Sequence, residues 1–220
     1  MDAKQAAIRE FDHWSRSYDR SLLQRFLFRP SHRAMVEQIR TGDLRILDVG
    51  CGTGKFASVV LESVPEAEVF GLDLSEQMLQ KGQPRLEQWP GRYHVVRGDS
   101  ERLPFAADSF DLVTCSHSFH HYPNQDRVVQ EMHRVLKPDG RLMLIDGNRD
   151  GWWGWLIFDV GVTTVEGQVH HCSGKRLRRL FAQAGFVELK QLRRNPFIPF
   201  LLTIGVAAKE TAPNVLAKAA

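Results

Sequence analysis

The chain has 220 residues, of which 43% are hydrophobic and 25% charged, with a formal net charge of +3. This composition is typical of an ordinary globular domain with one well-buried core, and the charge is too small to indicate nucleic acid. The three cysteines are far apart and form no CxxC pair, no secretory signal follows Met1, and no apolar stretch is long enough to span a bilayer. We therefore expect a soluble, cytoplasmic protein without disulfides.

The first part of the chain, residues 1–42, has a helical pattern and is expected to form a helical cap. Pro30 should interrupt it, because proline lacks an amide hydrogen and cannot complete the helical hydrogen-bond pattern. A second helix is expected from Ser31 to about Arg40, ending near Gly42.

The stretch LRILDVGCGTG at residues 44–54 is the strongest local signal. Its apolar run predicts a buried parallel strand, and residues 55–63 have helical spacing. Gly50, Gly52 and Gly54 stand at the turn between the two, where glycine allows backbone conformations that a Cβ forbids and lets a ligand approach closely. This arrangement predicts a nucleotide-type binding turn.

Strands and helices then alternate along the chain. The expected strands are 69–74, 93–98, 110–116 and 141–146, and the expected helices are 75–82 and 125–136. The stretch LKPDG at 136–140 should be a tight turn that ends the second of these helices. Such alternation indicates a parallel sheet with helices on both faces.

The last third of the chain is less regular. Residues 151–165 are tryptophan-rich and could form a helix or a lid. A helix is expected over 173–184, with Ser173 as its N-cap and Gly185 as its stop. Strands at 186–192 and 200–208 should form an antiparallel hairpin at the sheet edge, followed by a frayed tail at 210–220.

Polar side chains follow the strands at the edge where α/β sheets bind ligands: Asp48, Asp73, Asp99 and the pair Ser116-His117. Asp73 comes about twenty residues after the glycine turn, where an acidic side chain can accept the hydroxyls of a ribose. One such acid alone would more often be a helix cap, but the set predicts a ligand site. A GxxxxGK[ST] phosphate loop is excluded by Val49 and Phe56, and the spacing G-x-G-x-G differs from the dinucleotide pattern G-x-G-x-x-G.

Five segments identify a resemblance. They are LDVGCGTG at 47–54, GLDLSEQML at 71–79, GDSERLPFAADSFDLVTCSHSFHHYPN at 98–124, VVQEMHRVLKPDGRLMLID at 128–146 and, more weakly, FDHWSRSYD at 11–19. In these segments the chain resembles the class I S-adenosylmethionine-dependent methyltransferases, in particular the ubiquinone/menaquinone-biosynthesis C-methyltransferase branch.

The resemblance implies an α/β, three-layer Rossmann-like methyltransferase fold with a mostly parallel seven-stranded sheet and an antiparallel C-terminal edge hairpin. It implies one domain over residues 1–220. Its parts would be the helical cap at 1–42, a cofactor-binding core at 43–147, an acceptor-site and sheet-closing region at 148–209, and the tail.

The resemblance also implies that S-adenosylmethionine is the cofactor. Gly50, Gly52 and Gly54 would let the main chain pass close to its methionine part, and Asp48 would anchor the turn. Cys51 stands where this motif commonly has cysteine, and we interpret it as a packing residue. The remaining implied contacts are Asp73 with the ribose, Leu74 with the adenine ring, Asp99 and Ser100 with the adenine amine, Ser116 and His117 with the methionine end, and Tyr18, with Trp14, as a cover.

The nine histidines raise the question of a metal or a general base. His120-His121, or His170-His171 with Cys172, could supply metal ligands, but adjacent side chains usually diverge, so we expect no metal. A histidine could remove a proton from an oxygen or nitrogen acceptor. His117, His120, His121 and His171 are the candidates, and His121 and His171 are preferred because they flank the expected acceptor pocket. A structural role for each stays open, as does a mechanism without a base.

The late segment is rich in aromatic and basic side chains. Trp152, Trp153, Trp155, Phe158 and residues 197–200 could wall an apolar acceptor site or pack as a core helix. The basic residues at 175–179 and 193–194 are typical of a solvated face, or of contact with an anionic acceptor or membrane surface.

The sequence therefore predicts methyl transfer from S-adenosylmethionine to a small, apolar or aromatic metabolite, by a monomer or homodimer that does not bind nucleic acid. Two alternatives stay open. One is a quinone or lipid methyltransferase with peripheral membrane contact, and the other is an S-adenosylmethionine-binding protein without transferase activity.

Overall fold

The structure, a computed structural model, describes residues 22–162, 169–194 and 198–208. The predictions for Trp14, Tyr18 and the tail at 210–220 lie outside these residues.

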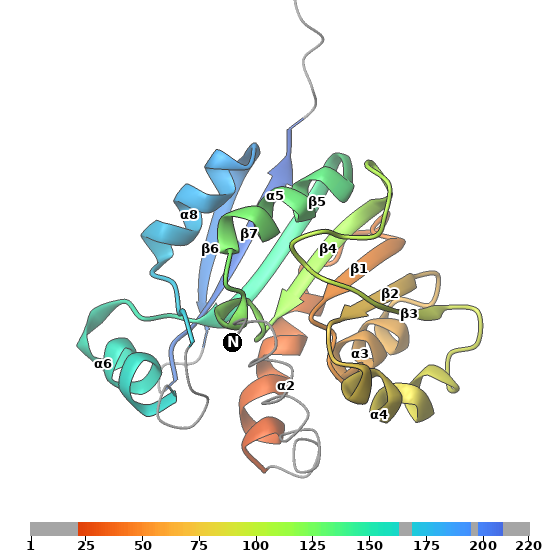
Figure 1. Cartoon of the computed structure of the whole chain (residues 1–220), viewed down its shortest axis with the longest axis horizontal. Coiled ribbons are helices and arrows are strands. Elements are labelled where there is room, and N and C mark those ends of the chain that lie inside the picture. Colours follow the sequence, from red (N-terminus) through yellow and green to blue (C-terminus); the bar gives the residue numbers. More distant parts are fainter. Residues whose placement is uncertain (1–21, 163–168, 195–197, 209–220) are drawn as a thin grey trace, which may run out of the picture.

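A seven-stranded sheet in the order β3-β2-β1-β4-β5-β7-β6 forms the middle of the molecule (Figure 1). The strands are β1 (Arg45–Val49), β2 (Glu68–Asp73), β3 (Tyr93–Arg97), β4 (Phe110–Ser116), β5 (Leu136–Gly147), β6 (Phe186–Arg194) and β7 (Phe200–Ala207). Neighbours from β3 to β5 pair in parallel, whereas β7 is antiparallel to both β5 and β6. The predicted mostly parallel sheet with antiparallel closing strands is confirmed. Strand β7 lies between β5 and β6, so β6 forms the edge of the sheet.

Helices cover both faces of this sheet (Figure 1). They are α2 (Leu22–Val36), α3 (Lys55–Ser63), α4 (Glu76–Leu86), α5 (Gln125–Val135), α6 (Gly151–Trp155) and α8 (Gly174–Gln183), with a 3-10 turn η1 (Phe119–His121) and a π-helical segment η2 (Leu156–Val162). Strand side chains alternate between the two faces, so Leu47 belongs to the same core cluster as Val129 and Phe181, whereas Ile46 belongs to a second cluster with Met35 and Val60. The two resulting cores give the predicted three layers.

The α2 helix corrects the prediction that Pro30 interrupts the N-terminal helices. It runs through Pro30 and ends at Val36, where a second helix to Arg40 was expected. Proline removes one backbone donor but does not forbid helical dihedrals for its own residue. Met35 is fully buried in the core one turn later, so tertiary packing outweighs the missing bond.

The stretch at 136–140 also differs from the expected turn. The β5 strand begins at Leu136, directly after α5, and Leu136 pairs with Phe110. The pairing then shifts, so that Leu112 faces Arg141, and Asp139 takes the left-handed conformation with φ 63°. A bulge therefore absorbs the extra residues.

Candidate functional site

A cavity of about 1150 Å³, its open mouth included, lies at the carboxyl ends of β1, β2 and β4. Polar lining comes from Asp48, Asp73, Asp99, Ser100 and Ser116. Apolar and aromatic lining comes from α2, α3 and η1.

The glycine turn forms one wall of this cavity. Gly50, Gly52 and Gly54 all have positive φ, between 55° and 74°, which glycine adopts without strain. At Gly50 a Cβ would collide with Ser118 and Tyr122, whereas at Gly52 no heavy atom lies within 4 Å of the Cβ position. Gly52 lines the cavity, so a ligand can approach its main chain there. Gly54 is outside the lining and contacts Tyr93 instead.

The Asp73 carboxylate connects the glycine turn to helix α4. Its Oδ2 accepts a hydrogen bond from the Gly52 amide at 2.8 Å, and its Oδ1 accepts one from the Ser75 amide at 2.9 Å. Burial raises the pKa of Asp73, and these amide donors oppose the shift. Each oxygen has a second lone pair, so the carboxylate can still accept from a ligand hydroxyl.

Asp48 lies deeper, below the turn, and is 2% exposed. Thr114 donates a hydrogen bond from Oγ1 to its Oδ1 at 2.9 Å. Burial raises the pKa of Asp48 to about 7, with a smaller upward contribution from Asp73. A cation in the cavity would therefore stabilise the charged form of this carboxyl group.

Three other predicted residues lie at the β2 and β3 side of the cavity: Leu74, Asp99 and Ser100. The Asp99 Oδ1 accepts a hydrogen bond from the Glu101 amide at 2.9 Å, which orients the carboxylate in its loop. Cys51 also lines the cavity, and burial raises the pKa of its thiol well above the usual value. A buried thiol of this kind is inert, as expected for a packing residue.

The wall after β4 carries Ser116, His117 and His121. The Ser116 Oγ and the His117 Nε2 are buried and have no hydrogen-bond partner within the described part of the chain. His117 has φ 53°, and its ring packs against Phe28 at 4.4 Å and Phe200 at 4.6 Å between centroids. Burial lowers the pKa of His117 to about 3 and that of His121 well below its usual value. Both rings are therefore neutral at pH 7.

Several residues that line the cavity were not predicted from the sequence, among them Phe28, His32 and Tyr122. Phe28 and His32 are four residues apart on α2, so they share one helix face, and that spacing is the signal that could have identified them. The Tyr122 hydroxyl lies 3.1 Å from the Ser118 Oγ, behind the glycine turn.

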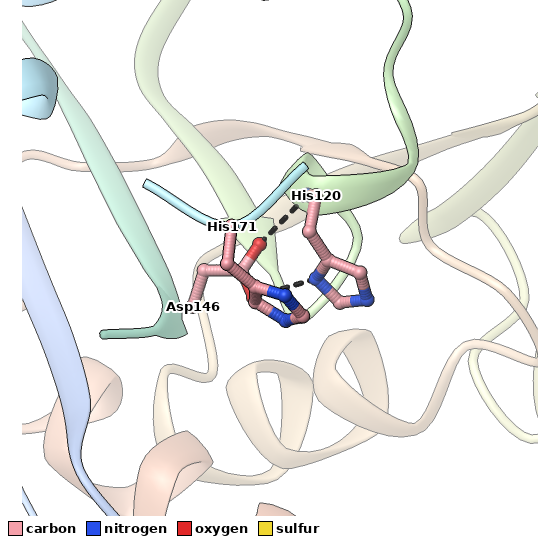
Figure 2. Close-up of side chains that lie close together, drawn as sticks. All are labelled: His120, Asp146 and His171. Atoms are coloured by element: carbon pink, nitrogen blue, oxygen red, sulfur yellow. Dashed lines mark hydrogen bonds and ion pairs between the residues drawn. The ribbon is translucent and has the colours of Figure 1, made fainter. Parts of the chain in front are cut away.

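His171, one of the two preferred general-base residues, is not in the cavity lining. It lies in a buried cluster with His120 and Asp146 (Figure 2). The His120 Nδ1 is 2.6 Å from the Asp146 Oδ1, and the His120 and His171 rings stack with centroids 4.4 Å apart. Of the two candidates, only His121 faces the cavity.

Residues 46–140 match the methyltransferase domain family. The matched segment contains the glycine turn and Asp48, Asp73 and Asp99, so the predicted resemblance to methyltransferases is confirmed.

Curated relatives of this domain include demethylmenaquinone methyltransferases. One from Geobacillus kaustophilus is 38% identical over 113 residues, which are 50% of this chain and 48% of that protein. One from Listeria welshimeri is 38% identical over 112 residues, again 50% of this chain and 48% of that protein. The chain therefore matches about half the length of these relatives.

Solved methyltransferase structures share the fold. A S-adenosylmethionine-dependent methyltransferase from Aquifex aeolicus has a TM-score of 0.69 at 17% identity, over 86% of this chain and 94% of that one. A phosphoethanolamine N-methyltransferase from Haemonchus contortus, bound to S-adenosylhomocysteine, has a TM-score of 0.72 at 17% identity, over 81% of this chain and 52% of that one. The methyltransferase fold thus extends beyond the matched segment into α8, β6 and β7.

Proposed function

We propose that the chain uses S-adenosylmethionine to methylate a small, apolar or aromatic metabolite. The observation that carries this proposal is the cavity itself, where a glycine turn with an open approach at Gly52 meets three strand-end carboxylates.

The lining residues fit S-adenosylmethionine better than a nucleoside phosphate. The cofactor has a sulfonium and an ammonium group, and the lining has more acidic than basic side chains, with Asp48, Asp73, Asp99 and Glu101 against Lys55. Aromatic faces such as Phe28 are also favourable for a sulfonium cation. The unpartnered Ser116 Oγ gives a buried polar group that a ligand can satisfy.

When bound, S-adenosylmethionine supplies an electrophilic methyl group on its sulfur. In this proposal Asp73 accepts hydrogen bonds from the ribose hydroxyls. Asp99 and Ser100 bind the adenine amine, and Leu74 packs against the adenine ring. Asp48 and the glycine turn hold the methionine end. Tyr18 is proposed as a cover.

The acceptor side is the wall formed by His117, His121 and Phe28. Because both histidines are neutral at pH 7, each has one ring nitrogen with a free lone pair. That nitrogen can accept a hydrogen bond or a proton from a hydroxyl or amine of the methyl acceptor. Their lowered pKa values make them weak bases. Alignment of the acceptor by this aromatic wall is therefore the larger proposed contribution, with His121 as the proton acceptor where one is needed.

Turnover tests the proposal directly. The purified chain is incubated with S-adenosylmethionine and fractionated small-molecule cell extracts, and formation of S-adenosylhomocysteine is followed. We expect formation with an organic-soluble fraction, and an increased KM for the cofactor in Asp99→Ala. The matched control Asp126→Ala, an exposed acid in the first turn of α5, should behave as wild type. Cofactor binding without turnover on any fraction would contradict the enzyme proposal and favour a binding protein.

A second candidate function is methyl transfer to a quinone or lipid at a membrane surface. The observation in its favour is three exposed tryptophans on α6: Trp152 is 75% exposed, Trp153 45% and Trp155 50%. Tryptophan prefers the interface between water and lipid. The start of α8 lies next to the start of α6, because the Gly174 amide donates a hydrogen bond to the Asp150 carboxylate at 3.1 Å. The basic side chains of α8 are therefore close to these tryptophans. Lys175 and Arg176 follow Gly174 and are exposed. Within the described residues no helix has the length and hydropathy to cross a bilayer, so contact would be peripheral.

Vesicle co-sedimentation tests this candidate. We expect binding to vesicles with anionic lipid at low salt, weakened by Trp152→Ser and by charge reversal at Arg178 and Arg179. Leu44→Ser, at an exposed leucine before β1, is the control. Absence of sedimentation at low salt, or equal sedimentation of Trp152→Ser and wild type, would rule out this surface.

A further inference from the structure

One histidine from each of two adjacent pairs meets Asp146 inside the protein. Figure 2 shows the three side chains pointing toward one another from separate segments: His120 from η1, Asp146 from the end of β5, and His171 from the stretch before α8. One ligand atom from each lies within 4.8 Å of the other two. Of the neighbouring histidines, His121 lines the cavity with its ring 4.1 Å from the His120 ring between centroids, and His170 is exposed.

All three side chains are buried, with residue exposures of 7%, 5% and 5% for His120, Asp146 and His171. The His120 amide donates a hydrogen bond to the Asp146 Oδ2 at 2.9 Å, and the His120 Nδ1 lies 2.6 Å from the Asp146 Oδ1. The carboxyl group and the His120 ring are therefore held side by side in the interior.

The His171 Nδ1 is buried and has no hydrogen-bond partner within the described residues. An unsatisfied buried nitrogen is costly in free energy and rare in native proteins. A neutral imidazole has one nitrogen with a free lone pair, and that nitrogen can bind a metal ion.

The backbone around the cluster is held in place by its own hydrogen bonds. The His170 amide donates to the His120 carbonyl at 2.7 Å. The Gln125 side chain donates to the His170 carbonyl at 2.8 Å, and Asn148 forms an isolated bridge with Cys172. The Gly147 amide donates to the Asp146 Oδ1 at 2.7 Å and orients the carboxylate. The three ligand residues are therefore positioned by independent contacts, as in a built site.

We propose that His120, Asp146 and His171 bind one divalent transition-metal ion, with Zn²⁺ as the representative ion. Two imidazoles and a carboxylate are a donor set suited to such ions, and calcium and magnesium prefer oxygen ligands. Three protein ligands leave a position for water or another ligand. The ion would also tie the segment before α8 to the sheet.

Metal binding requires a small rearrangement. Ligand atoms around a tetrahedral Zn²⁺ are about 3.4 Å apart, closer than the 4.8 Å limit of this cluster. The His120 and His171 rings are also nearly parallel, at 17°. Rotation of the His171 ring would bring a nitrogen toward Asp146, and the ion would replace the His120–Asp146 hydrogen bond.

The test is metal binding by the full chain, without cofactor, after removal of metal with a chelator. Calorimetry with Zn²⁺ and visible absorption with Co²⁺ should both give one ion per chain. His171→Gln and Asp146→Asn should weaken binding by at least about 100-fold, because each removes one of three ligands. His170→Gln is the matched control, since it removes the adjacent exposed histidine, and it should bind as wild type.

A second measurement does not depend on variants that could fold poorly. Zn²⁺ added to the metal-free wild type should raise its melting temperature, and a chelator should reverse the increase. The absence of stoichiometric binding by wild type, or equal affinities of His171→Gln and His170→Gln, would overturn the proposal. Because no S-adenosylmethionine is present, this result is independent of the proposed methyl transfer.

Discussion

Asp48 combines nearly complete burial with a place in the cavity lining, and its pKa is raised to about 7 by that burial. A cationic ligand favours the ionised carboxylate, so below pH 7 it must first displace a proton. We predict that the affinity for S-adenosylmethionine falls about tenfold between pH 8 and pH 6 through this group. Calorimetry at pH 6, 7 and 8 measures the change.

Asp48→Asn provides the comparison for this prediction. The variant keeps the shape of the side chain but cannot ionise, so its affinity should be lower and the Asp48 contribution to the pH dependence should vanish. The ligand's own groups titrate equally with both proteins. Identical pH dependence in the two proteins would contradict the role given to Asp48.

We predict a second pH effect, a loss of folding stability at low pH, from the burial of His117. Burial lowers its pKa from 6.5 in the unfolded chain to about 3 in the folded protein. Between these values the unfolded chain binds more protons, so stability is lost as pH falls below about 6.5. The free energy of unfolding should decrease by about 2 kcal/mol from pH 7.5 to pH 5 through this residue.

Urea denaturation at several pH values tests this loss of stability. His117→Asn removes the titrating ring, and asparagine tolerates the positive φ at this position. The variant should lose less stability than wild type on acidification. A slope equal to that of wild type would show that the His117 ring does not drive the effect.

At the scale of elements, helix starts were the most predictable features. Ser75 and Ser173 precede α4 and α8, and each side chain accepts a hydrogen bond from the third residue after it, Met78 or Arg176, at 3.2 Å. Such caps depend only on local sequence, because the donor and the acceptor are three residues apart.

Ser173→Ala should therefore reduce the free energy of unfolding by about 1 kcal/mol. Ser63→Ala in α3 is the control, since its exposed hydroxyl donates to the Val59 carbonyl within the same helix. Denaturant titration measures both variants. An equal effect of the two substitutions would mean that the N-cap bond adds nothing to the stability of α8.

Two elements were predicted wrongly from the sequence, and both depend on contacts with residues far away in the chain. The α2 helix continues through Pro30 because Met35 is fixed in the core, and no local rule reports that packing. The bulge between β4 and β5 depends on which residues of β4 face Leu136 and Arg141. Strand register of this kind is set by tertiary pairing.

The same distinction between local and distant determinants separates the site residues that were predicted from those that were not. The strand-end acids and glycines were predictable because parallel strands bring their carboxyl ends to one edge of the sheet. The cluster of His120, Asp146 and His171 was not, since it takes single residues from segments that are remote in sequence. The sequence drew attention to the adjacent pairs, whereas the cluster takes one histidine from each pair.

At the scale of the molecule, the match to known methyltransferase domains ends at residue 140, just after the start of β5. It includes all the residues that line the cavity except Phe28 and His32. The rest of β5 and the elements α6, η2, α8, β6 and β7 follow it, and they include Phe200, which packs against His117. The part of the chain after the matched segment thus packs against the cavity wall through Phe200.

The central claim is that the cavity at the carboxyl ends of β1 and β2 binds S-adenosylmethionine through Asp73. Isothermal calorimetry of wild type, Asp73→Ala and the control Asp126→Ala tests it most directly, with each variant first shown to retain the wild-type unfolding transition. The account predicts one bound ligand per chain, an affinity at least about tenfold lower for Asp73→Ala because a charged hydrogen-bond acceptor is lost, and no change for Asp126→Ala. Absence of binding to wild type, or equal affinities of wild type and Asp73→Ala, would contradict it.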